Sequence, residues 1–179
     1  MRIVFITGGA KSGKSTFALK TADGYSGKRA YIATAQALDD EMTKRIEAHR
    51  KERAGKWDTV EEPINIHQSI AALAVSHDVI VVDCLTLWLT NMLLKEPEPA
   101  EDVIYNAFSK LTDSLTTAKQ LKSDGSLILV SNEVGLSIVP DNRLARLFRD
   151  YAGVLNQQVA AVSDEAYLVV SGLPLRLNP

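Results

Sequence analysis

The pattern of apolar and polar positions alternates between two periods along the chain. Short runs of branched apolar residues, bounded by turn-forming residues, predict buried strands of a parallel sheet. Between these runs, apolar residues recur at spacings of three and four, which predicts amphipathic helices. This alternation predicts an α/β fold with a mostly parallel sheet. Strands are expected at 3–6, 30–34, 78–83, 126–131 and 165–171, and helices at 15–22, 38–53, 66–74, 85–94, 100–122 and 140–162.

Two further segments complete the expected sheet. Leu173, Leu175 and Leu177 alternate like a short strand, and Pro174 places that strand at an edge. Residues 57–63 form a connecting segment with room for another short strand. No repeat or low-complexity segment divides the sequence, so we expect one domain over residues 1–179.

The first loop carries the strongest chemical signal. Gly8-Gly9-Ala10-Lys11-Ser12-Gly13-Lys14-Ser15 fits the pattern G-x-x-x-x-G-K-[ST] and lies between an expected strand and an expected helix. The glycines let successive N–H groups point at phosphate oxygens, and the helix start adds the positive end of its dipole. Lys14 would reach the β- and γ-phosphates, and the Ser15 hydroxyl would hold Mg²⁺. A glycine-rich surface turn is the alternative, but the flanking strand and helix favour phosphate binding.

The ends of two other expected strands lie at the same edge of the sheet. Asp83 follows four branched apolar residues, which is the pattern of a Walker B strand, and such an aspartate binds Mg²⁺ directly or through water. Taken alone, the residue is more typical of a cap for the next helix, and the phosphate loop upstream favours the metal role. Thr34 and Ala35 end the second strand, where open α/β sheets bind ligands.

Composition and charge exclude several classes of partner. The 179 residues carry a formal net charge of −2 without a block of basic residues, which argues against nucleic acid or an anionic membrane as the main partner. Cys84 is the only cysteine, so neither an intrachain disulfide nor a thiolate zinc cluster is expected. The most apolar window, residues 79–94, is too short to span a bilayer. The first strand leaves no room for a signal peptide, so we expect a soluble, cytoplasmic protein.

The second helix carries the histidine with an expected chemical role. At 100° per residue, Met42, Ile46, His49 and Arg53 share a stripe about 60° wide that is apolar at its start and basic at its end. Nearby arginines would keep the His49 imidazole neutral, which is its nucleophilic form, and would also hold a phosphate. A histidine satisfied in the core is the alternative interpretation of this position.

Together these motifs resemble the bifunctional adenosylcobinamide kinase/adenosylcobinamide-phosphate guanylyltransferase family over essentially the whole chain. The His49 helix and the block 131–150 are the specific parts, because phosphate loops occur in many families. Lys11 stands where many members have arginine, which is a conservative difference. The matching segments are Gly8–Ser15, Tyr31–Thr34, Asp39–Met42, Arg45–Ile46 with His49, Arg50, Arg53 and Trp57, Asp83–Thr86, Thr90–Asn91, Ser131–Gly135, Ile138–Pro140, Asn142–Arg143 and Phe148–Asp150.

The resemblance implies a RecA-like P-loop NTPase fold, with helices on both faces of the sheet, and a homotrimer. It also implies two reactions. The first phosphorylates the aminopropanol hydroxyl of adenosylcobinamide with ATP or GTP. The second transfers GMP from GTP through a guanylylated histidine to give adenosylcobinamide-GDP and pyrophosphate.

The family's functional residues map onto single positions of this sequence. The guanylylated histidine falls on His49, and Glu61 would accept the N–H donors of guanine unless it is simply a solvated loop residue. The nucleotide contacts fall on Gly8, Gly9, Ala10, Lys11, Ser12, Gly13, Lys14, Ser15, Ala33, Thr34, Ala35, Arg50, Lys51, Glu52, Arg53, Glu61 and Asp83.

Two other functions stay open at this point. A monofunctional P-loop kinase would use the same phosphate site and give His49 no covalent role. A RecA-like subunit that gates assembly by binding nucleotide would hydrolyse it slowly, without a response to cobinamide. The lack of a basic stripe counts against a nucleic-acid-binding version of that subunit.

Overall fold

The central sheet is apolar on both of its faces, so helices cover both. The computed structural model describes residues 1–53, 55–96 and 99–178, with the backbone alone at Glu41, Arg45, His49, Glu52 and Arg53. The described residues form a seven-stranded sheet in the order β3-β2-β4-β5-β1-β6-β7, in which β6 and β7 pair antiparallel and the other pairs run parallel. The strands are β1 (Arg2–Gly8), β2 (Arg29–Ala33), β3 (Asp58–Glu61), β4 (Val79–Asp83), β5 (Ser126–Val130), β6 (Glu165–Val170) and β7 (Leu173–Arg176).

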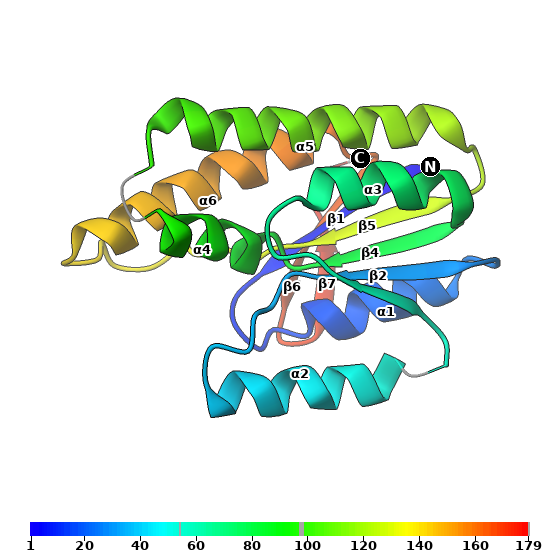
Figure 1. Cartoon of the computed structure of the whole chain (residues 1–179), viewed down its shortest axis with the longest axis horizontal. Helices are drawn as coiled ribbons and strands as arrows, with labels where there is room; N and C mark the ends of the chain where they lie inside the picture. The colour runs from blue at the N-terminus through cyan, green and yellow to red at the C-terminus, as the bar shows by residue number, and fades with distance from the viewer. Residues whose placement is uncertain (54, 97–98, 179) are drawn as a thin grey trace.

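The helices form two layers around this sheet. They are α1 (Lys14–Asp23), α2 (Asp40–Arg53), α3 (Ile66–Ser76), α4 (Leu85–Lys95), α5 (Glu101–Leu121) and α6 (Arg143–Val162). Figure 1 shows α3, α5 and α6 on one face of the sheet and α1 and α2 on the other. The α/β class, the parallel sheet and the helices on both faces are therefore confirmed.

The alternation of side chains along β1 explains the two cores. Ile3 and Phe5 pack under the helices α3 to α6, while Val4 and Ile6 pack against α1. Because successive side chains of a strand point to opposite faces, a continuous apolar run feeds both layers at once. The same division holds in β5, where Leu127 belongs to the first core and Ile128 to the second.

Most expected elements appear within a few residues of their predicted bounds, and the start of α6 differs for a clear reason. The helix begins at Arg143 rather than at residue 140. The Asn142 side chain accepts a hydrogen bond from the Ala145 N–H at 2.7 Å, which is the geometry of an N-cap. Pro140 lies outside the helix, and its carbonyl accepts a bond from Arg146 Nη1 at 2.9 Å.

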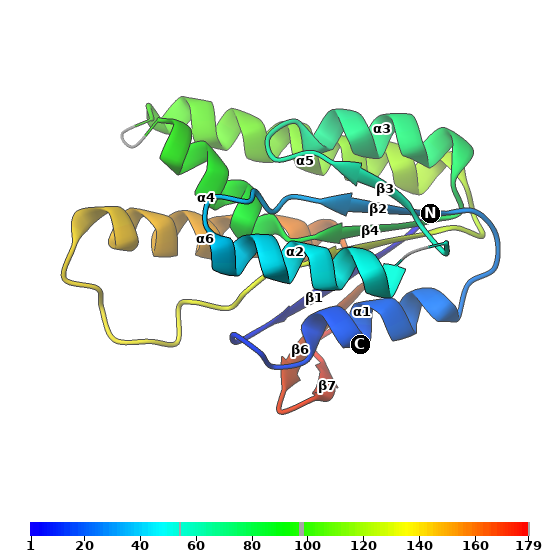
Figure 2. The same ribbon diagram turned by 60° about the horizontal axis from the view of Figure 1, so that its bottom comes forward.

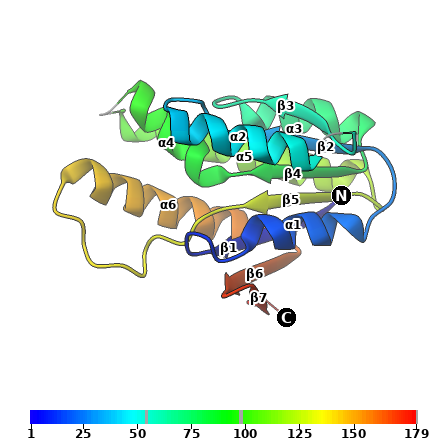
Figure 3. The ribbon, with the colours of Figure 1, turned by 90° about the horizontal axis from the view of Figure 1, so that it is seen from below.

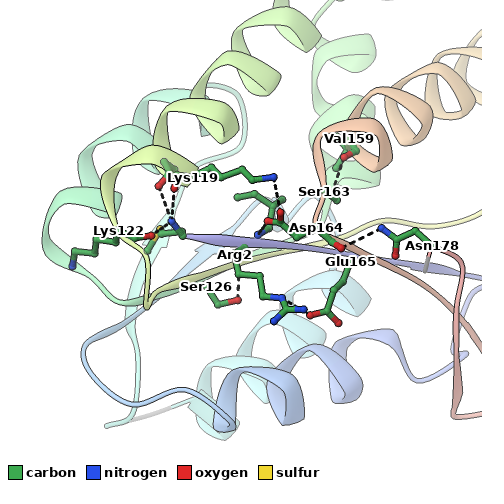
Figure 4. Close-up of polar contacts among 12 residues, drawn as sticks. Arg2, Lys119, Lys122, Ser126, Val159, Ser163, Asp164, Glu165 and Asn178 are labelled. Carbon is green, nitrogen blue, oxygen red and sulfur yellow. Dashed lines mark hydrogen bonds and ion pairs between the residues drawn. The ribbon is translucent and has the colours of Figure 1, made fainter.

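Polar contacts fix the end of the sheet that lies farthest from the glycine-rich loop (Figure 4). The α-amino group of Met1 donates to the carbonyls of Ala118 and Lys119, each at 3.0 Å, so a positive charge caps the last turn of α5. Asp164 accepts from the Ile3 N–H at 2.8 Å and pairs with Lys119 Nζ at 2.5 Å. These contacts hold the start of β1 between α5 and β6. They therefore help to fix the position of the glycine-rich loop, which follows the other end of β1.

Helix α2 differs from the other helices in sequence and in position. Its residues are mostly charged, with Met42 and Ile46 as its larger apolar side chains. In Figure 1 it lies farther from the sheet than α1, and Figure 3 shows it beside α1, over the half of the sheet that contains β2 and β4. Its role is therefore not to close the main core.

Candidate active site

The loop between β1 and α1 curls tightly because its backbone leaves the usual conformations. Lys11 has φ 53° and Gly13 has φ 100°, and the Ser12 N–H donates to the Gly9 carbonyl at 3.2 Å. The turn between β6 and β7 supports the loop from behind, where the Gly172 N–H donates to the Ser12 carbonyl at 2.8 Å. The predicted strand–loop–helix setting of the motif is thus present.

Gly8 is required by the neighbouring strand. It pairs with Val169 of β6, and a Cβ placed on Gly8 would lie 2.4 Å from the Val169 carbonyl oxygen. A Cβ on the adjacent Gly9 would meet no atom within 4 Å. The first glycine of the motif therefore serves close packing of backbone against backbone, whereas the second stands in open space.

Lys14 is buried at the start of α1. Its side chain crosses below the loop, and Nζ donates to the Gly9 carbonyl at 2.5 Å. Burial lowers the pKa of the Lys14 ammonium, while the nearby Asp83 carboxylate acts in the opposite direction. Lys14 therefore places a desolvated ammonium under the loop, within electrostatic reach of the carboxylate that ends β4.

Asp83 is held by a tyrosine from the neighbouring strand. The Tyr31 hydroxyl donates to Asp83 Oδ2 at 2.7 Å. Tyr31 is two residues before Ala33, the register partner of Asp83, so both side chains lie on the same face of the sheet. The Asp83 side chain is thus turned toward the glycine-rich loop and is not used as a side-chain cap of α4.

Buried polar groups join the ends of β2 and β4. The Thr34 hydroxyl donates to the Cys84 carbonyl and accepts from the Cys84 N–H, both at 2.8 Å. From α4, Asn91 Nδ2 donates to the Thr34 carbonyl at 2.7 Å and to the Pro63 carbonyl at 3.1 Å. These bonds satisfy groups that water cannot reach, so they fix the strand ends against each other.

A cavity of about 510 Å³ opens between the glycine-rich loop, the strand ends and α2. It has the size of a small-molecule site. Figure 2 shows how the loop, α1, α2 and the ends of β2 and β4 surround one region. The described lining residues are Ala10, Lys11, Ser12, Gly13, Lys14, Ser15, Thr16, Tyr31, Ala33, Ala35, Met42, Ile46, Glu61, Asp83, Cys84, Leu87, Val130 and Asn132.

The structure brings most, but not all, of the residues predicted from sequence to this cavity. Six residues of the loop, together with Ala33, Ala35, Glu61 and Asp83, line it. Gly8, Gly9, Thr34, Arg50 and Lys51 do not contribute to its described lining. Arg50 nevertheless reaches its rim, because Arg50 Nη2 bonds to Glu61 Oε1. Lys51 is exposed.

The predicted chemistry of α2 lies partly outside the described residues. Met42 and Ile46 line the cavity, which confirms that the apolar start of the predicted stripe faces inward. His49 follows Ile46 by three residues in the same helix, about one turn farther on. The side chains of His49, Glu52 and Arg53 are outside the described part of the structure, so their predicted roles stay predictions.

Sequence analysis gave a site role to none of six residues that line the cavity. Tyr31 and Asn132 appeared only within segments that match the family. The six residues are Thr16, Tyr31, Cys84, Leu87, Val130 and Asn132. A signal for Tyr31 exists in the sequence, since it is an aromatic residue with a polar tip between the apolar residues Ala30 and Ile32 of a strand.

The residues at the cavity suit a magnesium ion. The Ser15 hydroxyl and the Asp83 carboxylate are hard oxygen donors on two sides of the cavity. Mg²⁺ typically takes one or two protein oxygens together with phosphate oxygens and water. Among the described residues, no group of three or more histidine, cysteine, aspartate or glutamate side chains is placed to hold a metal by itself. The donor set therefore fits an ion that arrives with a nucleotide.

The fold and the loop together define the class of protein. The parallel sheet, the glycine-rich loop after β1 and the carboxylate at the end of β4 are those of a RecA-like P-loop NTPase fold. The structure of the assembled ATPase EscN from the enteropathogenic E. coli type III secretion system superposes with a TM-score of 0.55 at 14% identity. The match covers 95% of this chain and 43% of that chain, and it concerns the fold alone.

Sequence similarity to known proteins then identifies the family to which the chain belongs. The family described as cobinamide kinase / cobinamide phosphate guanyltransferase matches residues 4–177, and the chain belongs to it. The bifunctional adenosylcobalamin biosynthesis protein CobU of Escherichia coli (strain K12) is 41% identical over 98% of this chain and 99% of its own length. The protein of the same name from Salmonella typhimurium is 40% identical with the same coverage. The bifunctional adenosylcobalamin biosynthesis protein CobP of Pseudomonas aeruginosa is 41% identical over 97% of this chain and 95% of its length.

In the part of the chain that the structure describes (residues 1–53, 55–96 and 99–178), no helix is both long enough and apolar enough to cross a bilayer.

The two adjacent glycines of the loop give a matched test of its packing. Gly8→Ala should lower the free energy of unfolding by about 2 kcal/mol or more, because a methyl group must be forced against the Val169 carbonyl. Gly9→Ala should change it little, because the methyl group enters open space. Urea unfolding followed by circular dichroism measures both. Equal losses of stability in the two variants would contradict the packing described for Gly8.

Proposed function

We propose that this chain, as one catalytic domain, phosphorylates the hydroxyl of adenosylcobinamide and then joins GMP to the resulting phosphate. One observation carries the proposal: Lys14, Ser15 and Asp83 face a single cavity in a chain that matches the family from residue 4 to residue 177. The phosphoryl donor is ATP or GTP, and the guanylyl donor is GTP. The products of the second reaction are adenosylcobinamide-GDP and pyrophosphate.

The kinase step needs positioning and charge more than covalent chemistry. The acceptor hydroxyl oxygen forms a bond to the γ-phosphorus, the bond from that phosphorus to the β–γ bridging oxygen breaks, and the hydroxyl proton is lost to solvent or a base. The loop N–H groups and the Lys14 ammonium stabilise the charge that develops on the phosphate oxygens. When bound by Ser15 and Asp83, Mg²⁺ would supply further positive charge to the same oxygens.

The guanylyl step uses the α-phosphorus of GTP. A neutral His49 imidazole nitrogen attacks it, a P–N bond forms, and pyrophosphate leaves. A phosphate oxygen of adenosylcobinamide phosphate then attacks the same phosphorus, which forms the P–O–P bond of the product and releases the imidazole. The position of His49 on α2, about one turn from the cavity-lining Ile46, supports this assignment.

Glu61 is proposed to select guanine. It lines the cavity at the end of β3, and its carboxylate matches the two N–H donors on the guanine edge. In this structure Arg50 bonds to that carboxylate, so a guanine would have to take its place. Both side chains are about half exposed, and exchanging such a surface ion pair costs about 1 kcal/mol or less.

We also propose a homotrimer. An apolar segment supports self-association: in the loop before α6, Leu136 is 86% exposed and Ile138 is 93% exposed. Val139, the next residue, is also exposed, and several exposed apolar side chains in one segment are typical of an interface between proteins.

Lys14 tests whether the two reactions share one phosphate site. Lys14→Ala should lower kcat/KM of both reactions by about a hundredfold or more, because each needs the triphosphate held on the loop. Lys20→Ala, on the exposed side of the same helix, should leave both unchanged. Steady-state assays of each half-reaction decide the matter. A Lys14→Ala enzyme that keeps either activity at a normal rate would refute the shared site.

His49 tests the covalent step. His49→Ala should lose guanylyl transfer and keep much of the kinase activity, because the acceptor hydroxyl attacks the γ-phosphate without help from an enzyme nucleophile. The wild-type enzyme incubated with α-labelled GTP should carry a label that mild acid releases and alkali does not, as expected for a P–N bond. His49→Asn is a gentler variant, since it keeps a polar atom but cannot carry GMP.

Two results would contradict the role of His49. One is normal guanylyl transfer by either variant. The other is a labelled adduct that persists without His49, which would move the nucleophile elsewhere. A kinase that never becomes labelled would instead be monofunctional.

A further inference from the structure

Asp83 is a weakly constrained side chain by itself. The terminal torsion of an aspartate is broad, so the plane of its carboxylate is set by whatever bonds to it. Among the described residues, the Tyr31 hydroxyl is the partner of Oδ2, and Oδ1 has no hydrogen-bond or ion-pair partner. The residue lines the cavity. One oxygen is thus fixed by the protein and the other is left to the ligand.

We propose that Tyr31 is a positioning residue for the metal site: its hydroxyl fixes Asp83 Oδ2 and so directs Oδ1 toward a divalent cation bound with the nucleotide. This inference rests on the proposed function, in which Asp83 and Ser15 hold Mg²⁺. Partners that orient a metal-binding side chain commonly change metal affinity tenfold to a hundredfold when they are removed.

Tyr31 is itself held firmly. Its side chain is 4% exposed, and its ring meets Trp57 edge to face, with centroids 5.9 Å apart and planes at 84°. Arg29 lies 5.7 Å over the Trp57 ring and is anchored by Asp23 Oδ1 at 2.7 Å and by the Tyr25 carbonyl at 3.1 Å. These contacts hold the Tyr31 hydroxyl in one position, so the Asp83 carboxylate would lose its hydrogen bond if it rotated.

The register of β2 and β4 also places the Tyr31 hydroxyl beside Asp83. Tyr31 pairs with Val81, and Asp83 is two residues farther along the same strand, so the hydroxyl reaches diagonally from β2 to the end of β4. A phenylalanine would fill the same space against Trp57 and leave the carboxylate without this bond. The contribution of the hydroxyl can thus be removed without removing the ring.

The experiment compares the affinity of a non-hydrolysable ATP analogue with Mn²⁺ and with EDTA. In Tyr31→Phe, the gain in affinity produced by the metal should fall about tenfold, while the metal-free affinity stays at its wild-type value. The Mg²⁺ concentration needed for half-maximal kinase activity should rise by a similar factor, and kcat at saturating Mg²⁺ should be nearly normal.

Two further variants make the result specific. Tyr167→Phe removes a similar bond at a residue that does not line the cavity, since Tyr167 donates to Glu165 on β6 and packs edge to face on Phe17. It should leave the metal-dependent gain unchanged. In the Asp83→Ala background, Tyr31→Phe should have no additional effect, because its target is gone.

The outcomes separate this inference from the function on which it rests. If Asp83→Ala leaves the metal-dependent gain intact, the metal role of Asp83 fails, and the role of Tyr31 fails with it. If Asp83→Ala abolishes the gain but Tyr31→Phe and Tyr167→Phe both behave like wild type, only the role of Tyr31 is refuted. A Tyr31→Phe enzyme that loses affinity equally with Mn²⁺ and with EDTA would also refute it, because that loss is structural.

Discussion

The sharp turn by which the chain leaves β1 and enters α1 constrains everything else in this molecule. The turn can form only where β1 passes close to β6, and Gly8 permits that approach by lacking a Cβ. The β6–β7 turn supports it from behind through the bond from Gly172 to Ser12. The far end of β1 is fixed by Asp164 and the α-amino group of Met1. The loop is thus held from several directions before any phosphate arrives, so little ordering is left for ligand binding to accomplish.

The residues of the proposed site belong to two different parts of the fold. The ends of β2 and β4 are joined by buried bonds through Thr34 and Asn91, and Tyr31 adds Asp83 to the same framework. Helix α2, by contrast, is mostly charged and lies away from the sheet. The proposed phosphate and metal contacts therefore lie on the sheet and its loop, and the proposed covalent step lies on a charged helix outside the main core. Such a division suits an enzyme that must present different phosphorus atoms to different nucleophiles.

The sequence predicted the local features well, because each is specified by neighbouring residues. The strand 3–6, the loop Gly8–Ser15 and the inward side of Met42 and Ile46 all follow from short-range periodicity or a compact motif. The start of α6 was misplaced, although Asn142 followed by Ala145 is a readable cap. The bond from Tyr31 to Asp83 joins residues 52 positions apart, and its geometry depends on the register of two strands. The contact of Arg50 with Glu61 depends likewise on how a helix lies over a strand end. Sequence patterns of one chain carry no information about such distances.

The central claim is that one triphosphate site, centred on the glycine-rich loop, serves both proposed reactions. Equilibrium dialysis with non-hydrolysable analogues of ATP and GTP, used singly and together in the presence of Mg²⁺, tests it most directly. The account predicts one analogue bound per chain and full mutual displacement, with an inhibition constant for each analogue equal to its own dissociation constant. Two analogues bound to one chain at the same time, or binding of one that the other cannot reduce, would contradict it.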